Sequence, residues 1–566
     1  MFGVKNIHLI VAVACTLHAA SASGNASLQT PAQEPSLFLH EAQQRREAIE
    51  QDQRQRQLRR EPAPARVPAI RTADGAEAPE APCWYLSGVS LSGNQLIDDA
   101  AIRTAIAPLL APCLGPGRIN QILATITSLY TAAGYVASRP LLLAPPADGQ
   151  ALELAIEEGF VEAVELADQD LPISLGAAFP DMLGEPLQLR ALEQGLDQLN
   201  RLRSIDLTAD IEPGQWRGGS RIVLRSLSRL PRWQASGGLD NGGSASTGRH
   251  RSHFSLALDS PLEHNDFFSL YGVHSRVGDA AGSETVGGYY SLPWGPWSVS
   301  LGANHFRHRS VAEGLRGSLA LSGSTTLLSY SVERALWRDQ NSLLSATLRL
   351  DDKRAEGRLS GQRLPVQSPR YHSLEAGLNA LWLGEATWVV YLGYSRGLGG
   401  WSGNDGLKVK QPGAQSARYG KWRANVSRTA SLSWAGLNWT LASIWQGQYS
   451  AQRMPQLESL PLASGSIVRG FERRAAQGDS GLAWRNTLSL PLALPQGLRL
   501  NPSLGLDAGW LEGQGQARGD HLLGASFGMS LDHPSGSLAA EYQRSLYRRN
   551  APREPGFWRL ALQLRF

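Results

Sequence analysis

The chain has 566 residues, more than one ordinary domain, so several modules are expected. A formal net charge of +4 is too small for this length to indicate nucleic-acid binding. Beyond the N-terminus no run of about 18 apolar residues occurs, which excludes helical membrane spans and leaves β-barrel insertion as the route into a membrane.

Residues 1–22 are typical of a signal peptide. Lys5 supplies the positive start, residues 7–14 the apolar core, and Ala20-Ser21-Ala22 a cleavage site of small residues. The alternative is a lipoprotein signal that ends at Cys15, but Ala12, three positions before the cysteine, matches that signal poorly. We therefore expect an exported protein.

Three cysteines occur, and removal of Cys15 with the signal leaves Cys83 and Cys113. An even pair in an exported protein predicts a disulfide bond, here across 113 − 83 = 30 positions. Two free buried thiols are the alternative. No metal-ligand spacing accompanies the pair, so we expect no metal site.

Residues 36–60 predict a polar helix, because three acid–base pairs stand four residues apart: Glu41/Arg45, Glu50/Arg54 and Asp52/Arg56. Apolar side chains are too sparse for a packing stripe, so the helix has to lie in water, between domains or inside an aqueous channel. A charged disordered tail is the alternative. Residues 61–82 contain five prolines and predict a semi-extended linker.

Residues 83–159 and 160–230 predict two small α/β modules, each with a strand, helices and two further strands. In the first module we expect strands at 84–91, 136–143 and 151–157, with a helix between the first two. In the second we expect strands at 160–166, 205–211 and 221–227. Four leucines at intervals of 3, 4 and 3 mark the helix of the second module: Leu189, Leu192, Leu196 and Leu199.

Residues 231–566 consist of short segments in which apolar residues alternate with polar or small ones, as in 297–304, 344–351 and 558–566. This pattern is typical of a transmembrane barrel, with lipid outside and water inside. A soluble β-sandwich gives similar alternation, but tryptophans near segment ends favour the barrel. The 566 − 230 = 336 residues accommodate about 14 to 18 strands. We expect the terminal Phe566 to act as the barrel-assembly signal.

No catalytic motif is present: G-x-S-x-G, H-E-x-x-H and the P-loop are all missing from the sequence. The alternation instead lapses between 452 and 480, which predicts a long functional loop with Val468-Arg469-Gly470-Phe471 inside it. An arginine folded into a lumen needs a carboxylate partner, and we expect Asp507, which has small neighbours, to be that partner. The alternative is an exposed arginine in a surface loop.

In order along the chain, these features resemble the transporters of the two-partner secretion pathway, the TpsB type. The resemblance rests on the polar helix, the proline-rich linker, two POTRA-like modules and a short ordered set of motifs: Asp240-Asn241-Gly242, Thr247-Gly248, Val468-Arg469-Gly470-Phe471, Gly478-Asp479-x-Gly481, Asp507-Ala508-Gly509 and Phe566. Tyrosine is common in the family where this chain has Phe471.

The resemblance implies α+β periplasmic modules followed by a transmembrane antiparallel barrel of 16 strands in a Gram-negative outer membrane. It further implies a helix that plugs the pore, a sixth extracellular loop folded inward, and an ion pair between Arg469 and Asp507. The modules would capture an unfolded partner exoprotein (an adhesin, cytolysin or contact-dependent toxin) and the barrel would pass it to the cell surface. Barrel-assembly machinery and outer-membrane lipid are the other partners that we expect. We expect no cofactor, no catalytic residue and no nucleic-acid partner.

Three alternatives remain open on the sequence. The first is a barrel-assembly insertase of the same superfamily, which shares the arginine loop but has a longer array of modules. The second is a passive porin or adhesive surface barrel, for which the two modules would be superfluous. An enzyme is the third, and no motif supports it.

Overall fold

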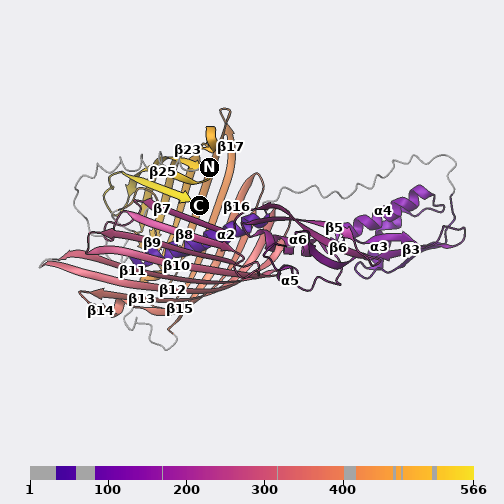
Figure 1. The fold of residues 1–566 in the computed structure, drawn as a ribbon, viewed down its shortest axis with the longest axis horizontal. Helices are drawn as coiled ribbons and strands as arrows, with labels where there is room; N and C mark the ends of the chain where they lie inside the picture. Colours follow the sequence, from indigo (N-terminus) through magenta and orange to yellow (C-terminus); the bar gives the residue numbers. More distant parts are fainter. Residues whose placement is uncertain are drawn as a thin grey trace.

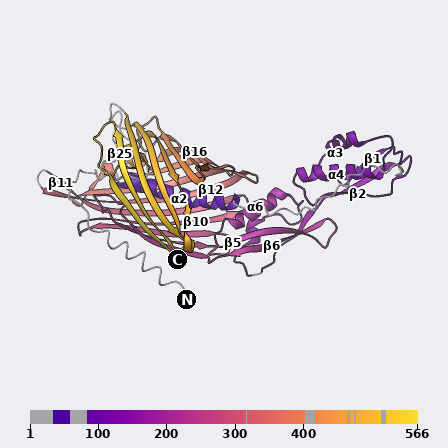
Figure 2. The same cartoon turned by 90° about the horizontal axis from the view of Figure 1, so that it is seen from above.

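The computed structural model describes residues 34–58, 83–168, 170–314, 317–400, 416–462, 467–472, 476–512 and 519–566. Two small α/β modules extend in line from one end of a large β-barrel, and a single helix lies inside that barrel (Figures 1 and 2). The expected signal peptide, residues 1–22, and the linker, residues 61–82, lie outside the described residues.

The first module is a three-stranded sheet covered by two helices. Its elements are β1 (Gly88–Ser92), α3 (Asp99–Ile106), α4 (Pro116–Ala132), β2 (Arg139–Leu142) and β3 (Ala151–Glu157). The strand order is β1-β3-β2, with β1 parallel and β2 antiparallel to β3. Ile119, Ile122 and Ile126 of α4 are buried against β3, as the sequence predicts. The first strand begins later than expected, because Trp84 instead forms an isolated bridge with Leu114.

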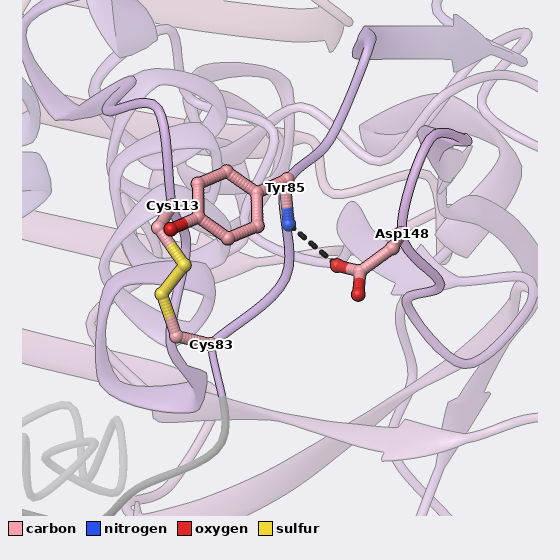
Figure 3. The surroundings of a disulfide bond; sticks show 4 residues. All are labelled: Cys83, Tyr85, Cys113 and Asp148. Carbon is pink, nitrogen blue, oxygen red and sulfur yellow. Dashed lines mark hydrogen bonds between the residues drawn. A yellow bond between two sulfur atoms is a disulfide. The ribbon is translucent and has the colours of Figure 1, made fainter.

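A disulfide bond ties the start of this module to the segment before α4. Cys83 and Cys113 are joined with their Cα atoms 5.6 Å apart (Figure 3). The backbone N–H of Tyr85, which follows the bridged Trp84, donates to Asp148 Oδ1 at 2.7 Å (Figure 3). These links fix the chain where it enters the module.

The second module repeats this plan with β4 (Phe160–Leu166), α5 (Leu175–Ala178), α6 (Leu189–Asn200), β5 (Ile205–Pro213) and β6 (Gly219–Arg229). Its strand order is β4-β6-β5. Leu192, Leu196 and Leu199 of α6 are buried against the sheet. Two of the three strands begin or end beyond the expected ranges, because sequence alternation does not resolve strand ends.

Sixteen long antiparallel strands in the described residues close into a barrel. They are β7 (Trp233–Asp240), β8 (Arg251–Asp259), β9 (Phe267–Val277), β10 (Ala281–Trp294), β11 (Trp297–Gly314), β12 (Gly317–Arg338), β13 (Ser342–Leu359), β15 (Arg370–Trp382), β16 (Ala386–Gly399), β17 (Gly420–Trp434), β18 (Leu437–Tyr449), β21 (Ser480–Ser489), β23 (Arg499–Glu512), β24 (Asp520–His533), β25 (Gly536–Arg548) and β26 (Phe557–Arg565). Two short segments, β14 (Gln362–Leu364) and β22 (Leu492–Ala493), extend neighbouring hairpins. The last strand pairs with the first over five residue pairs, from Ala561↔Asp240 to Arg565↔Ser236.

The alternation places apolar residues on the outer wall and polar residues on the inner wall. On β13, Leu348 is exposed outward, whereas Ser345, Thr347 and Arg349 are buried toward the lumen. Gly237 and Gly238 lie inside β7. The physical reason is space: a Cβ at Gly238 would meet the ring of His253 at 2.4 Å.

The second module contacts the near end of the barrel through α6. The guanidinium of Arg338, at the end of β12, forms ion pairs with Asp197 and Glu193 of α6. Arg201, which follows α6, donates to Ser298 Oγ at 2.8 Å and also to Ser291 Oγ. The module is therefore fixed across the mouth of the barrel.

The helix in the lumen, α2, spans Glu34–Leu58 (Figure 2). Its described length begins two residues before the expected start, and the last two expected residues lie outside the described ones. It packs along the adjacent strands β11, β12 and β13, and its glutamates also reach Arg423 of β17 and Arg251 of β8. A helix that is polar almost all round is stable here because the inner wall is polar too.

Candidate functional site

The long loop between β18 and β21 folds back into the barrel. Within it lie a one-turn helix, η4 (Gln456–Glu458), and a short antiparallel pair, β19 (Leu460–Pro461) and β20 (Gln477–Gly478). The tip, Val468 to Phe471, is buried throughout. The loop is therefore an internal element of the barrel.

Arg469 at this tip is 1% exposed and forms a bidentate ion pair with Asp507 on the inner face of β23. Its Nη2 lies 2.6 Å from Oδ1 and its Nε 2.7 Å from Oδ2. The backbone N–H of Arg469 also donates to Oδ2 at 2.9 Å. Planar guanidinium and carboxylate groups match in this geometry, which makes it both strong and directional.

Two further acceptors complete the surroundings of Arg469, and the sequence did not reveal either. Nη1 lies 3.1 Å from Glu541 Oε1 on β25, and Nη2 donates to the carbonyl of Asn486 on β21. Glu541 follows the inward–outward alternation of its strand, so the pattern could have placed it on the lumen face. Burial of one cation beside two carboxylates is tolerated because nearly every donor is satisfied.

Small residues on the wall make room for the loop. A Cβ at Gly505 would meet Arg469 Cζ at 2.3 Å, and one at Gly524 would meet the carbonyl oxygen of Arg469 at 1.9 Å. At the tip, Gly470 has a φ of +91°, and a Cβ there would meet the backbone carbonyl carbon of Arg544 at 2.4 Å. Glycine is required at position 470 for both conformation and space.

Apolar side chains on either side of Arg469 anchor the tip. Val468 and Phe471 are fully buried in a cluster with Leu462, Leu511 and Leu522. Phe471 therefore packs its ring as an anchor without needing the hydroxyl of a tyrosine. The arginine is held in place from both sides by apolar burial.

Polar contacts link α2 to two separate parts of the barrel wall. Arg54 donates from Nε and Nη2 to the two carboxylate oxygens of Glu333 on β12, each at 3.0 Å. Glu47 accepts from Arg423 at 3.3 Å and from Asn425 at 3.0 Å, both on β17. These contacts join polar groups whose hydrogen bonds water can also supply.

The two ends of α2 are held differently. Near its start, Phe38 stacks on Phe306 of β11 with ring centroids 5.1 Å apart. Near its end, Asp52 lies 3.3 Å from Arg203, which follows α6 of the second module. The helix therefore touches the loop end of the barrel at one end and the module at the other.

The two modules form a continuous joint at Glu157. Its carboxylate accepts from Arg139 of the first module at 3.0 Å and from Arg217 of the second at 2.7 Å. Burial raises the pKa of Glu157, and the hydrogen bonds from the two guanidiniums lower it by more, so its pKa is below the usual value. Both links require the ionised carboxylate.

No helix among the described residues is long and apolar enough to cross a membrane. In the same residues no group of three or more histidine, cysteine, aspartate or glutamate side chains is arranged to hold a metal ion.

A closed 16-stranded barrel with an internal arginine-locked loop, a helix in its lumen and two modules across one mouth defines an outer-membrane protein translocator with periplasmic modules. The chain belongs to the family described as haemolysin secretion/activation protein ShlB/FhaC/HecB, whose family model matches residues 218–531. Two further models match the modules: a POTRA domain of ShlB type at 84–159 and a POTRA domain at 160–213.

Named relatives agree with this assignment. The chain is 32% identical to hemolysin transporter protein ShlB of Serratia marcescens, over 81% of this chain and 79% of that one. It is 28% identical to outer membrane transporter CdiB of Escherichia coli, over 88% and 85%. Among solved structures, CdiB from Escherichia coli has the same fold, with a TM-score of 0.83 and 24% identity over 96% of this chain and 100% of that one.

Proposed function

We propose that this translocator exports one large exoprotein of the adhesin, cytolysin or contact-dependent toxin type. Two relatives are named hemolysin transporter proteins, HpmB and ShlB, which supports the cytolysin class, and another is named outer membrane transporter CdiB. The cargo enters unfolded from the periplasm and leaves at the cell surface. The absence of a catalytic motif from the sequence supports a role without enzymatic activity or cofactor.

The modules, with proposed bounds 83–159 and 160–230, capture the cargo by strand addition. Each three-stranded sheet has two edge strands, and β5 is the longest of these four edges at nine residues. An extended segment can pair with such an edge through its backbone, which needs little side-chain specificity. Apolar side chains are exposed on or beside the edges, among them Leu142, Leu143 and Ile211.

The lumen becomes the conduit when α2 leaves it, and the polar contacts of α2 are the observation that carries this step. A plug has to be held closed yet be released at low cost. Ion pairs such as Arg54–Glu333 exchange readily for hydration because both charged groups remain in an aqueous channel. The Arg469–Asp507 pair keeps the loop fixed against the wall while the cargo passes.

Four further roles complete the proposal. Residues 1–22 direct export and are removed, and residues 61–82 act as the linker that lets α2 move. Phe566 is recognised by the barrel-assembly machinery. The apolar outer wall, with exposed Trp294, Trp297 and Trp558, contacts outer-membrane lipid.

The test is a secretion assay in an outer membrane. Cells express this chain with the N-terminal fragment of the exoprotein encoded beside it, and the fragment is measured in the medium. We expect the fragment outside with the wild-type chain and inside with a chain that lacks residues 83–230. Equal secretion by both chains, each shown to be inserted, would refute capture by the modules.

A further inference from the structure

A second anchor holds the same loop at a different part of the wall. Glu458 of η4 is 4% exposed, and its two carboxylate oxygens accept from two lysines. Oε1 lies 2.7 Å from Lys353 Nζ on β13, and Oε2 lies 2.6 Å from Lys421 Nζ on β17. Tyr371 on β15 donates its hydroxyl to Oε1 at 2.8 Å. One loop side chain therefore binds three strands.

The polarity of this anchor is the reverse of the first one. At the tip, the loop supplies the cation Arg469 and the wall supplies the anion Asp507. At η4, the loop supplies the anion Glu458 and the wall supplies the cations. The two anchors lie on different strands, β23 and β25 for the first and β13 to β17 for the second. The loop is thus tied across the lumen rather than at a single point.

The start of α2 packs against the loop beside the second anchor. Met454 and Leu457, beside Glu458 in sequence, are buried in one cluster with Phe38, Leu39 and Ala42 of α2. Ser36 Oγ also donates to Gln477 on the return branch of the loop at 3.0 Å. The position of η4 therefore determines whether this apolar contact with α2 exists.

We propose that Glu458 is a positioning residue that keeps α2 in the lumen by clamping η4 to Lys353 and Lys421. This inference rests on the proposed role of α2 as a plug. Removal of the carboxylate leaves two buried lysines with a single, more distant counter-charge, Asp351, at 3.6 Å from Lys353, so the η4 segment moves away from the wall. The apolar contact with Phe38 and Leu39 is lost, and α2 leaves the lumen more often.

The test is single-channel conductance of the purified full-length chain in planar bilayers, beside secretion in cells. We expect Glu458→Ala to raise the fraction of time in the open state by about tenfold or more. The exchange variant Glu458→Lys/Lys353→Glu, which keeps the same three charges, should restore the wild-type fraction. The matched control is Glu356→Ala, which removes an exposed glutamate paired with Arg358 on the same strand, β13, and should change nothing.

Two outcomes separate this inference from the plug itself. If deletion of residues 34–58 raises conductance but Glu458→Ala does not, the clamp is refuted and the plug stands. If the deletion leaves conductance unchanged, the plug is refuted. If the exchange variant is open as often as Glu458→Ala, the charge-based account is refuted. Restored charges can rescue a lost ion pair, but they cannot rescue a defect that is merely structural.

A separate feature lies on the outer wall at the extracellular end of β16, β17 and β18. Three exposed aromatic side chains form one cross-strand row, in which Tyr394 is opposite Trp422 and Trp422 is opposite Tyr449. The rings of Tyr394 and Trp422 lie 4.9 Å apart. Together with Arg396 and Arg418 they line a hollow of about 420 Å³.

The two arginines differ from others at this rim. Arg354 and Arg358 are also exposed, and each is paired with a carboxylate of its own strand, Asp352 and Glu356. Among the described residues neither Arg396 nor Arg418 has such a partner. Exposed aromatic rows on membrane proteins mark the level of the lipid headgroups, so a guanidinium pair beside such a row matches a phosphate above acyl chains.

We propose that this hollow binds the phosphorylated sugar headgroup of a glycolipid of the outer leaflet. The arginines would bind the phosphate, and Tyr394, Trp422 and Tyr449 would pack against the sugar and the first part of the acyl chains. The site adjoins Ala451 and Gln452 at the base of the inward loop. Lipid bound here would therefore stabilise the rim where that loop begins.

The test measures retained glycolipid by mass spectrometry after purification of the full-length chain in mild detergent. The probes are an acylated glucosamine disaccharide with two phosphates, the same glycolipid without phosphates, and inorganic phosphate. We expect Arg396→Gln/Arg418→Gln to retain at least about fivefold less of the phosphorylated lipid. The control Arg354→Gln/Arg358→Gln should retain the wild-type amount. Equal retention of the phosphorylated lipid by all three chains refutes the site, and so does equal binding of the phosphate-free lipid. If inorganic phosphate alone displaces the lipid, the hollow is a phosphate site without a lipid role, and the proposal is refuted as well.

Discussion

The carboxylate of Asp507 accepts hydrogen bonds from three nitrogens of one residue, Arg469. Nη2 lies 2.6 Å, Nε 2.7 Å and the backbone nitrogen 2.9 Å from its oxygens. The backbone contact means that the carboxylate fixes the main chain of the loop tip as well as its side chain. Loss of the arginine side chain therefore leaves a buried carboxylate with only part of its hydrogen bonds.

The first prediction concerns this pair. Arg469→Ala should reduce secretion by at least about tenfold, because breaking a buried pair costs about 3 to 5 kcal/mol and frees the loop tip. The measurement is exoprotein in the medium against the amount of heat-modifiable barrel in the outer membrane. Arg549→Ala, at an exposed arginine beyond β25, is the matched control and should secrete normally. Normal secretion by Arg469→Ala would show that the lock is dispensable.

The second prediction concerns the contact between α2 and the wall. Glu333→Gln removes the negative charge of the carboxylate that accepts hydrogen bonds from Nε and Nη2 of Arg54. We therefore expect α2 to leave the lumen more often and channel openings to become several times more frequent. Bilayer conductance measures this directly. Glu284→Gln, at an exposed glutamate of β10, serves as control. An unchanged opening frequency in Glu333→Gln would mean that this pair does not hold the helix.

The third prediction concerns the disulfide bond. Cys83→Ser/Cys113→Ser should lower the stability of the first module by about 3 to 4 kcal/mol, the loop-closure value for a separation of this size. Hydrogen exchange of the β3 amides in the full-length chain measures the loss, and the β6 amides of the second module provide the internal reference. Unchanged exchange in β3 would show that packing around Ile119, Ile122 and Ile126 suffices.

The fourth prediction is a pH dependence at the joint between the modules. Since the pKa of Glu157 is lowered in the folded chain, its contribution to stability is complete above its usual value of 4.5 and is lost as the pH falls through the lowered pKa. Exchange of the Phe160 amide, which donates to Gly218, the residue after Arg217, at 3.0 Å, should therefore quicken in acid beyond the intrinsic rate. In Glu157→Gln we expect faster exchange of this amide at neutral pH and no further acceleration in acid. If the acceleration in acid persists in this variant, another group is responsible for it.

The barrel could be predicted from the sequence because alternation is a short-range pattern, whereas Asp507 was a candidate partner of Arg469 whose pairing the family resemblance implies. Alternation of period two fixes which side chains face the lumen, and small residues around Asp507 mark the space for the loop. The other two acceptors of Arg469, Glu541 and the carbonyl of Asn486, could not be found in the same way. Glu541 is one of several inward carboxylates, and only the three-dimensional path of the loop selects it.

The helix in the lumen shows the other limit. Its apolar residues were too few for a packing stripe, and yet Phe38, Leu39 and Leu58 are buried, because the partners that cover them belong to the wall and the loop. Sequence periodicity describes one helix against one flat surface. It cannot describe a helix that is enclosed by segments distant in sequence. One such segment is the loop around η4, whose Met454 and Leu457 cover the start of α2.

The pairing of β26 with β7 has a consequence for the order of events during biogenesis. Ser236 and Arg565 are neighbours in the closed sheet but stand more than 300 positions apart in the chain. Contacts of such sequence separation form slowly, since the loop-closure entropy has to be met before they form. The first strand therefore waits with an unpaired edge until the last one arrives, and this interval is when the nascent chain depends most on a protein that covers that edge.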